Sequence, residues 1–281
     1  MAMMPRMSHH HDAELEDHDK GLAFDMPRLI SRRRALGVLT GSVASAALTA
    51  CGASSGSSGS ASTSASTTTT GGESSTEIPD ETAGPYPGDG SNGPNVLTES
   101  GVVRRDITKS FGDASGVAKG VPATVEMTLL DVAGGGTPLA GAAVYLWHCN
   151  IDGHYSLYDD DVAQENYLRG VQESDADGKL SFTTIFPAAY AGRWPHIHFE
   201  VYESLDSATS GGSKLKTSQI ALPHETCELV YAADGYEQSV TNLAQTSLDT
   251  DNVFSDGYAS QLATASGGVD DGIRVALNVG V

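Results

Sequence analysis

The sequence predicts an all-β sandwich with short helices and long loops, and three observations indicate it. Residues 196–202 alternate between apolar and polar side chains, the two-residue period of a strand with one buried face. Residues 142–150 are rich in β-branched and aromatic residues, as strands are. Glycine, aspartate and asparagine recur between such segments, as in sandwich turns. We therefore expect one sandwich domain, without an internal repeat.

The other elements follow from the same signals in chain order. Residues 76–120 contain many glycines, asparagines and aspartates, so we expect an irregular, extended arm. The turn signal at residues 175–178 predicts that the strands on its two sides form a hairpin. The patterns predict further strands over 124–131, 168–174, 179–185, 219–222 and 274–281, and short helices over 225–231 and 236–242.

The 281-residue chain divides into three segments by composition. Residues 52–72 consist only of glycine, alanine, serine and threonine. Such a tract cannot bury enough apolar surface to offset chain entropy, so we interpret residues 52–75 as a flexible linker. Residues 76–281 then form the folded domain, and residues 1–51 form a targeting segment.

The targeting segment carries an export signal. Arg32 and Arg33 belong to a twin-arginine pattern, residues 36–50 form a short apolar run, and Cys51 follows small residues as in a lipobox. We expect twin-arginine export, with a lipid anchor at Cys51 on the outer face of the cytoplasmic membrane or secretion. Cleavage of the signal stays open. A short buried helix is the alternative interpretation of residues 36–50.

Charge excludes some partners. The chain has 36 acidic and 16 basic residues, a net charge of −20, and the first 51 residues carry six of each sign. The excess of acid therefore belongs to the remaining residues. This argues against nucleic acid and against an anionic membrane as partners, so we expect membrane contact only through the lipid anchor. A small anionic substrate is not excluded, because one local arginine can dominate a pocket.

Two cysteines remain if Cys51 is lipidated. Cys149 and Cys227 are an even number in an oxidising compartment, so we predict a disulfide between them. Two separate buried thiols are the alternative. Metal ligation by this pair is disfavoured, because the close Cys-x-x-Cys spacing is missing.

The chemistry is concentrated in residues 188–201. If Ile197 and its alternate neighbours face the core, His196 and His198 face outward from one strand, with Cα atoms about 7 Å apart. Two such imidazoles can reach one metal ion. Tyr190 and Arg193 precede them, and Tyr155 follows the strand at 142–150. From the residues alone, we expect a metal site on a β-sandwich.

These residues resemble the motifs of the intradiol ring-cleavage dioxygenases, the protocatechuate and catechol dioxygenase group. The resemblance runs from about residue 78 to residue 225, and it includes the Thr-Ala-Gly-Pro-Tyr arm at 82–86. It implies a prealbumin-like β-sandwich. It also implies a mononuclear, non-haem Fe(III) with four ligands: Tyr155, Tyr190, His196 and His198.

The resemblance further implies roles in catalysis. Tyr190 would leave the iron when a catechol binds and would take a proton from it. Arg193 would stabilise negative charge on the bound ring, and Gln219 would lie near the same centre. The reaction would use O2 to give a cis,cis-muconate-type dicarboxylate. The chain lacks the long helical segment through which catechol-type members dimerise, so the oligomeric state stays open, a homo-oligomer included.

Other interpretations stay open at this point. Tyr158 is the alternative to Tyr155 as ligand, and Arg193 is alternatively a surface ion-pair partner. A cupin-type metalloenzyme would use His196, His198 and Glu203, with His224 as a poorly placed third histidine. A non-catalytic binding sandwich at the cell surface would explain the tether but not the tyrosines and histidines.

Overall fold

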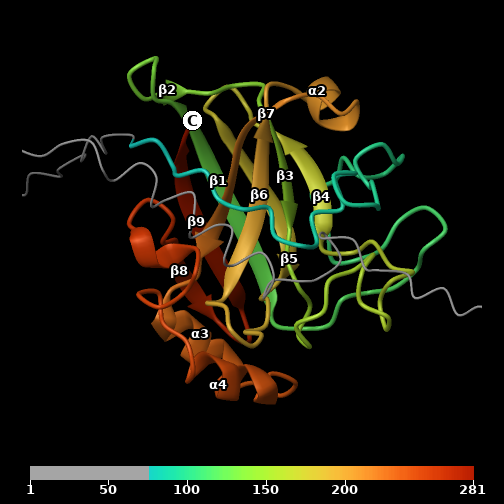
Figure 1. The fold of residues 1–281 in the computed structure, drawn as a ribbon, viewed down its shortest axis with the longest axis vertical. Helices are drawn as coiled ribbons and strands as arrows, with labels where there is room; N and C mark the ends of the chain where they lie inside the picture. Colours follow the sequence, from blue (N-terminus) through green and yellow to red (C-terminus); the bar gives the residue numbers. More distant parts are fainter. Residues whose placement is uncertain (1–75) are drawn as a thin grey trace, which may run out of the picture. The chain divides into compact units, whose positions relative to one another are not determined.

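Two β-sheets stacked face to face make up the described part of the chain, which is residues 76–281 of a computed structural model (Figure 1). The four-stranded sheet runs in the order β4 (Arg169–Glu173), β3 (Ala143–Trp147), β6 (His196–Tyr202) and β7 (Lys214–Ala221). In the other sheet, β1 pairs in parallel with β9 and antiparallel with β2 and β5, while β8 pairs with β9. Its strands are β1 (Pro122–Asp131), β2 (Thr137–Pro138), β5 (Lys179–Ile185), β8 (Thr264–Gly268) and β9 (Gly272–Gly280).

The core lies between the sheets and follows the two-residue period of the strands. On β1, Val125, Met127 and Leu129 point into it. On β6, the alternate residues Phe199 and Val201 do the same, together with Ile197. The polar residues of β6 therefore face away from the core, as the sequence predicts. The β-sandwich predicted from the sequence is confirmed.

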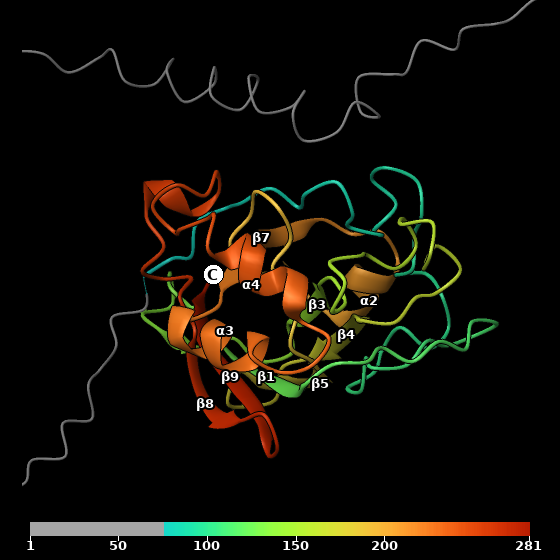
Figure 2. The ribbon, with the colours of Figure 1, turned by 90° about the horizontal axis from the view of Figure 1, so that it is seen from below.

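The first part of the arm, residues 76–120, covers the outer face of the four-stranded sheet. Figure 2 shows this part (cyan) on the side of that sheet that faces away from the other sheet, whereas the later part of the arm bridges β4 at Val103 and β5 at Asp106. Val96, Leu97 and Val102 of the arm are buried in one cluster with Tyr145 and Trp147 of β3. The outer face of β6 is buried as well, so the polar side chains on it lie under cover rather than in solvent. The arm has only isolated bridges and turns, which confirms the predicted irregular structure.

Helices occupy the two ends of the sandwich. α3 (His224–Tyr231) and α4 (Glu237–Leu243) lie at one end, and α2 (Leu205–Thr209) lies at the other (Figure 1). A single 3-10 turn spans Phe254–Asp256. The two longer helices agree with the sequence prediction to within a residue. No helix within residues 76–281 is long and apolar enough to cross a bilayer.

The predicted hairpin at residues 175–178 is wrong, although the turn is present. The amide of Gly178 donates to the carbonyl of Asp175, which closes the turn. However, β4 before it pairs with β3, and β5 after it pairs with β1 in the other sheet. The turn therefore carries the chain from one layer of the sandwich to the other. An Asp-Gly signal reports a reversal of the chain, while strand pairing is decided by distant partners.

The predicted disulfide is also wrong, because the structure holds both cysteines as free, buried thiols. Cys149 packs under the arm with Tyr145 and Trp147, and its thiol lies 3.7 Å from the carbonyl oxygen of Ala188. Cys227 lies on α3 in the core between the sheets. The two thiols thus belong to different apolar clusters. The predicted export signal, the lipid anchor at Cys51 and the linker lie outside the described residues.

The buried His148 makes the stability of the fold depend on pH. Its Nδ1 lies 2.8 Å from the carbonyl oxygen of Cys149, and its Nε2 lies 2.7 Å from Oγ1 of Thr184. Burial lowers the pKa of His148 from 6.5 to about 4. Between these two pH values His148 is protonated in the unfolded chain but stays neutral in the folded protein. The contribution of His148 to the unfolding free energy is therefore fully present above pH 6.5. It falls by about 3 kcal/mol as the pH falls toward 4.

We expect His148→Asn to remove one proton from the pH dependence of the unfolding free energy, measured by urea titration between pH 4.5 and 7. The slope should drop by about 1.4 kcal/mol per pH unit in the steepest region. His224→Asn is the matched control, because His224 is exposed on α3. Equal slopes in the wild type and in His148→Asn would contradict the prediction.

Candidate metal centre

β6 and two loops bring the predicted site residues together on the outer face of the four-stranded sheet. His196 and His198 are the first and third residues of β6, so they share a face. His198 lies opposite Trp147 of β3 and Gln219 of β7 in the ladder. Tyr155 lies in the loop after β3, and Tyr190 lies in the loop that leads into β6.

Four potential ligand atoms form a continuous chain of short contacts. Oη of Tyr155 lies 3.4 Å from Oη of Tyr190. The Tyr190 Oη lies 3.0 Å from Nε2 of His196, which in turn lies 3.1 Å from Nε2 of His198. Tyr155 and the two histidines are buried, whereas Tyr190 is partly exposed. The structure therefore brings all four predicted ligands to one point, and one of the four is accessible.

The histidine hydrogen bonds orient the imidazoles for metal binding. Nδ1 of His196 lies 2.5 Å from the carbonyl oxygen of Trp194, so this nitrogen carries the proton and donates. The lone pair of its Nε2 is then directed at the cluster. Nδ1 of His198 is buried without a partner, and its Nε2 also faces the cluster. Both histidines thus present the same nitrogen to one point.

Burial fixes the charge states of these groups in the protein alone. It lowers the pKa of His196 and of His198 well below the usual range, with the positive charge of Arg193 as a further cause. Burial also raises the pKa of Tyr155 and of Tyr190 above 10. The imidazoles are therefore neutral, as metal ligation requires, and the phenols ionise only if a strong cation lies beside them.

The residues fit a ferric ion. Donor separations of 3.0 to 3.4 Å match neighbouring corners of a coordination polyhedron with metal–donor distances of about 2.1 Å. Within residues 76–281, no three His, Cys, Asp or Glu side chains gather into a metal-binding group, so a centre here depends on the tyrosines. Two phenolates are hard, anionic donors, which suit Fe(III) rather than Fe(II) or zinc. The donor set of Tyr155, Tyr190, His196 and His198 therefore fits a ferric ion.

Arg193 lies beside this cluster and is held from three directions. Its Nη1 lies 3.4 Å from Nε2 of His196, and its Nη2 donates to Oε1 of Gln219 at 2.7 Å. Its Nε donates to Oδ2 of Asp251 at 2.9 Å. The side chain is buried, so the alternative of a surface ion-pair partner is wrong. The arrangement fixes a positive charge next to the ligand cluster.

Asp251 is a site residue that the sequence analysis missed. Its carboxylate is fully buried and also accepts hydrogen bonds from the amides of Trp194, Val253 and Phe254. It is one of many acidic residues, and it lies 58 positions after Arg193. No spacing or periodicity marks it, so the sequence offered no signal that could have found it.

The arm closes the site from above. The amide of Gln219 donates from Nε2 to the carbonyl oxygen of Thr82, which joins β7 to the arm. Gly84 has φ of +73°, and a Cβ there would lie 3.2 Å from Cε1 of His198, so glycine is needed for this close approach. The ring of Tyr86 packs on the ring of Tyr155 with a distance of 4.9 Å between the ring centroids. The ring of Trp147 stacks on that of His198 with the same distance of 4.9 Å between centroids.

Three nearby residues lie outside the cluster. Oη of Tyr158 accepts from the amide of Gly88 and donates to Oδ1 of Asn92, so this phenol serves the arm and not the centre. His148 is bonded elsewhere, as described above. His154 is partly exposed and lies 3.8 Å from Asp161. The geometry favours Tyr155 over Tyr158 as a ligand.

The cupin ligand set is not assembled. Glu203 follows the end of β6 and is exposed. His224 lies on α3, stacks on Trp194 and pairs with Glu228. Neither side chain is directed at the cluster of Tyr155, Tyr190, His196 and His198.

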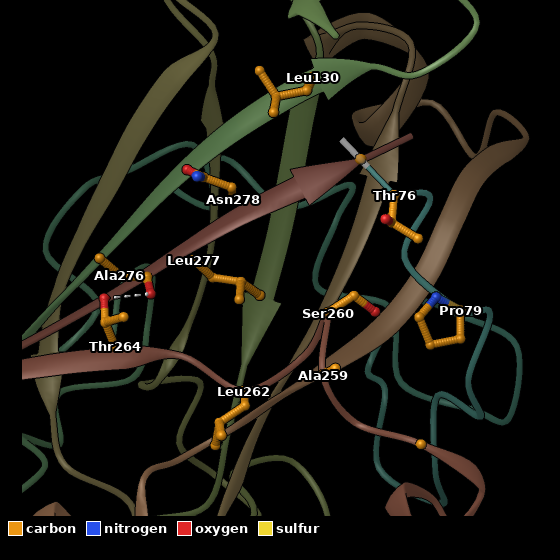
Figure 3. A pocket seen from close by; sticks show the side chains of 12 residues that line it. Thr76, Pro79, Leu130, Ala259, Ser260, Leu262, Thr264, Ala276, Leu277 and Asn278 are labelled. Atoms are coloured by element: carbon orange, nitrogen blue, oxygen red, sulfur yellow. Dashed lines mark hydrogen bonds between the residues drawn. The ribbon is translucent and has the colours of Figure 1, made fainter. Parts of the chain in front are cut away.

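A large surface cavity lies on the other sheet. It has a volume of about 760 Å³ and is lined by the start of the arm, by β1, β8 and β9, and by residues 257–262 (Figure 3). Thr76, Ser260, Thr264 and Asn278 give it polar atoms, and Leu130 and Leu262 give it apolar ones. None of the residues that line it belongs to the ligand cluster.

Known proteins match the part of the chain that contains the cluster. A family model described as Dioxygenase matches residues 92–206. Catechol 1,2-dioxygenase 1 of Acinetobacter lwoffii is 46% identical over 92 residues, which cover 26% of this chain and 29% of that protein. The 6-chlorohydroxyquinol 1,2-dioxygenase of Cupriavidus pinatubonensis is 35% identical over 117 residues, covering 33% of this chain and 41% of that protein. The chain thus spans less than half of the length of these relatives.

The solved structures agree on the fold. The intradiol ring-cleavage dioxygenase from Tetranychus urticae superposes with a TM-score of 0.52 at 23% identity, over 65% of this chain and 87% of that chain. This likeness concerns the sandwich itself. The matched segment at residues 92–206 includes all four ligand candidates and Arg193. Residues 92–206 are thus similar to dioxygenases, and the sandwich is similar in fold to an intradiol ring-cleavage dioxygenase.

Proposed function

We propose that this protein cleaves the ring of a catechol between its two hydroxylated carbons, with O2 as oxidant, to a cis,cis-muconate-type dicarboxylate. The observation that carries the proposal is the convergence of two phenol oxygens and two imidazole nitrogens with separations of 3.0 to 3.4 Å. We assign Tyr155, Tyr190, His196 and His198 as ligands of a mononuclear, non-haem Fe(III). Bound there, the ferric ion supplies a centre that withdraws electron density from the ring and makes it reactive toward O2.

Tyr190 is suited to receive a proton from the substrate. It is the only one of the four ligand candidates that is partly exposed, so it is the ligand that an entering catechol can displace with the least disturbance of the core. Its Oη then acts as a base positioned at hydrogen-bond distance from the substrate hydroxyl. Tyr155 and His198 stay in place, because the rings of Tyr86 and Trp147 pack on them. His196 stays in place because it is buried and bonded to the carbonyl oxygen of Trp194.

Arg193 provides fixed positive charge for the reacting ring. Nη1 of Arg193 is directed at the cluster, 3.4 Å from Nε2 of His196, while Gln219 and Asp251 hold its other nitrogens. A preorganised guanidinium stabilises negative charge that develops on a bound catecholate without a cost of reorganisation. Gln219, which lies opposite His198 in the ladder, and Asp251 both hold the guanidinium of Arg193 by hydrogen bonds.

The named relatives support a catechol-type substrate, and they act on catechol or on chlorinated hydroxyquinol. The sequence signal leads us to propose that the reaction takes place outside the cytoplasm, with Cys51 as a lipid anchor. The excess of acidic residues agrees with a small-molecule substrate and not with nucleic acid.

The product tests the proposal. Iron-loaded protein should consume O2 and catechol in equal amounts and form a colourless dicarboxylate with both new carboxyl groups derived from the hydroxylated carbons. Reaction in ¹⁸O2 followed by mass spectrometry should place one labelled oxygen in each carboxyl group. Formation of a yellow semialdehyde, which arises by cleavage outside the two hydroxyl groups, would contradict intradiol cleavage.

A further inference from the structure

Arg169 begins β4 and uses its whole guanidinium inside the protein. The residue is 1% exposed. Its Nε donates to Oγ of Ser156 at 3.0 Å, and its Nη2 donates to the carbonyl oxygens of Ser156 at 2.8 Å and of Tyr86 at 2.9 Å. Its Nη1 donates to the carbonyl oxygen of Pro87 at 2.9 Å and to Oη of Tyr145 at 3.0 Å. All five N–H groups therefore have a partner.

The partners of Arg169 are all uncharged. Within the described residues, the fully buried ion pair is that of Arg193 with Asp251, and no carboxylate pairs with Arg169. A buried charge is costly, and an apolar side chain of similar size would fill the same space without that cost. An apolar side chain could fill the space of Arg169, but it could not make these five hydrogen bonds.

The five bonds connect the two sides of Tyr155. Ser156 follows Tyr155 directly in the chain, so its two bonds fix the backbone beside the ligand candidate. Tyr86 lies in the arm, and its ring packs on the ring of Tyr155 at 4.9 Å with an interplanar angle of 31°. Oη of Tyr145 adds a second link, because it donates to the carbonyl oxygen of Pro87 at 2.7 Å. One guanidinium therefore holds Tyr155 through its backbone and through its ring contact.

The surrounding backbone is strained and fitted to this contact. Leu157 and Leu168 have φ of +74° and +57°, a region that L-residues other than glycine rarely adopt. Both lie in the loop between β3 and β4: Leu157 lies between Tyr155 and Tyr158, and Leu168 directly precedes Arg169. Gly88 has φ of +65°, and a Cβ there would lie 2.8 Å from Nη1 of Arg169. At Gly88 the arm thus approaches the guanidinium at a distance that only glycine permits. On the other side of the guanidinium lies the loop with the strained residues Leu157 and Leu168.

We propose that Arg169 is a positioning residue that joins the arm to the loop at residues 155–168 and thereby sets the position of the Tyr155 phenol oxygen. The proposal rests on the assignment of Tyr155 as a metal ligand in the proposed function. Arg169 touches neither the substrate space nor the ligand atoms. Arg169 couples the arm to Tyr155, so a change that makes the arm more mobile also makes Tyr155 more mobile.

Hydrogen exchange on the metal-free protein tests the coupling. Arg169→Lys keeps the charge but offers three donors on one atom, so it cannot replace the five bonds that three nitrogens of Arg169 make. We expect the amides of Gly88 and Val96 in the arm and of Leu157 in the loop to exchange at least about 10-fold faster, all together. These amides are hydrogen-bonded in the structure. Exchange in β1 and β9 should stay unchanged.

Lys216→Met is the matched control. Nζ of Lys216 holds only the start of the arm, at Glu77 and Asp80. Its loss should speed exchange there and leave Leu157 unchanged. If Arg169→Lys does not fold, Tyr145→Phe serves instead, because it removes the weaker link to Pro87. Amide exchange in the arm and in the loop at residues 155–168 should then both be about 3-fold faster. Faster exchange in only one of the two segments, or in neither, overturns the proposal.

A second readout separates this proposal from the proposed function. In iron-loaded Arg169→Lys, the visible tyrosinate-to-iron band should shift and a chelator should remove iron faster than from the wild type. If the wild-type protein takes up no iron, the proposed function fails, and the exchange experiment still decides the coupling. If the wild type shows the band but Arg169→Lys changes neither band nor exchange, the positioning role of Arg169 alone is wrong.

Discussion

Tyr155→Phe is expected to lower the affinity for ferric iron on the order of 100-fold or more and to reduce ring cleavage below detection, while Tyr158→Phe, which acts on the site only through the arm, lowers both by a much smaller factor. Loss of one anionic ligand should exceed the 10- to 100-fold effects of residues that only support ligands. Tyr155 contributes an oxygen 3.4 Å from Oη of Tyr190, whereas the Tyr158 oxygen is bonded to Gly88 and Asn92.

The two variants form a matched pair, because each removes one hydroxyl group from the same loop. Iron affinity is measured by competition with a chelator, and the position of the visible band reports on the remaining tyrosinate. Phenylalanine at position 155 leaves the buried ring in place, so the fold should be retained and the unfolding free energy of the metal-free protein should change little. Loss of iron in Tyr158→Phe with retention in Tyr155→Phe would reverse the ligand assignment.

The second large effect concerns the charge held beside the cluster. Arg193→Gln should lower kcat about 100- to 1000-fold with iron content unchanged, as removal of a preorganised electrostatic group does. Asp251→Asn should lower kcat in the same direction by a smaller factor, because the guanidinium keeps its charge but loses its strongest anchor. It should also destabilise the fold by about 3–5 kcal/mol, since a buried arginine is left without its carboxylate.

Arg274→Gln is the control for the loss of one positive charge. Arg274 is exposed on β9 and pairs with Glu126 at 3.3 Å, so its replacement should change neither kcat nor stability noticeably. Steady-state kinetics on iron-quantified protein and urea unfolding provide the two measurements. Wild-type kcat in Arg193→Gln would remove this residue from the proposed chemistry.

Local patterns of the sequence predicted the strand at 196–202 and the outward direction of both histidines, because alternation depends only on the residues themselves and on one buried face. Pairing is different. The sequence indicates the turn at residues 175–178 correctly. However, β4 and β5 on its two sides join different sheets, because β4 pairs with β3 and β5 pairs with β1. The disulfide failed for a similar reason, because a count of cysteines contains no information on which cluster buries each thiol.

The ligand candidates could be named from the sequence because Tyr190, His196 and His198 are close together in it and Tyr155 stands in a motif that resembles one of the intradiol dioxygenases. The residues that hold the site are different. Asp251 reaches Arg193 from the C-terminal part of the chain, and Arg169 reaches Tyr86 across 83 positions. Such contacts arise only when the arm, the loops and the sheet are folded together, so nothing in the local pattern could reveal them.

The visible spectrum and iron content of the folded domain, residues 76–281, before and after anaerobic addition of catechol, test the central claim most directly. A ferric ion held by two tyrosinates absorbs visible light, so we predict a red-brown protein with a single iron per chain, whose band shifts when catechol binds. A histidine and carboxylate site would lack this phenolate band. A protein that stays colourless after reconstitution with ferric iron would contradict the assignment of Tyr155, Tyr190, His196 and His198 as the ligands.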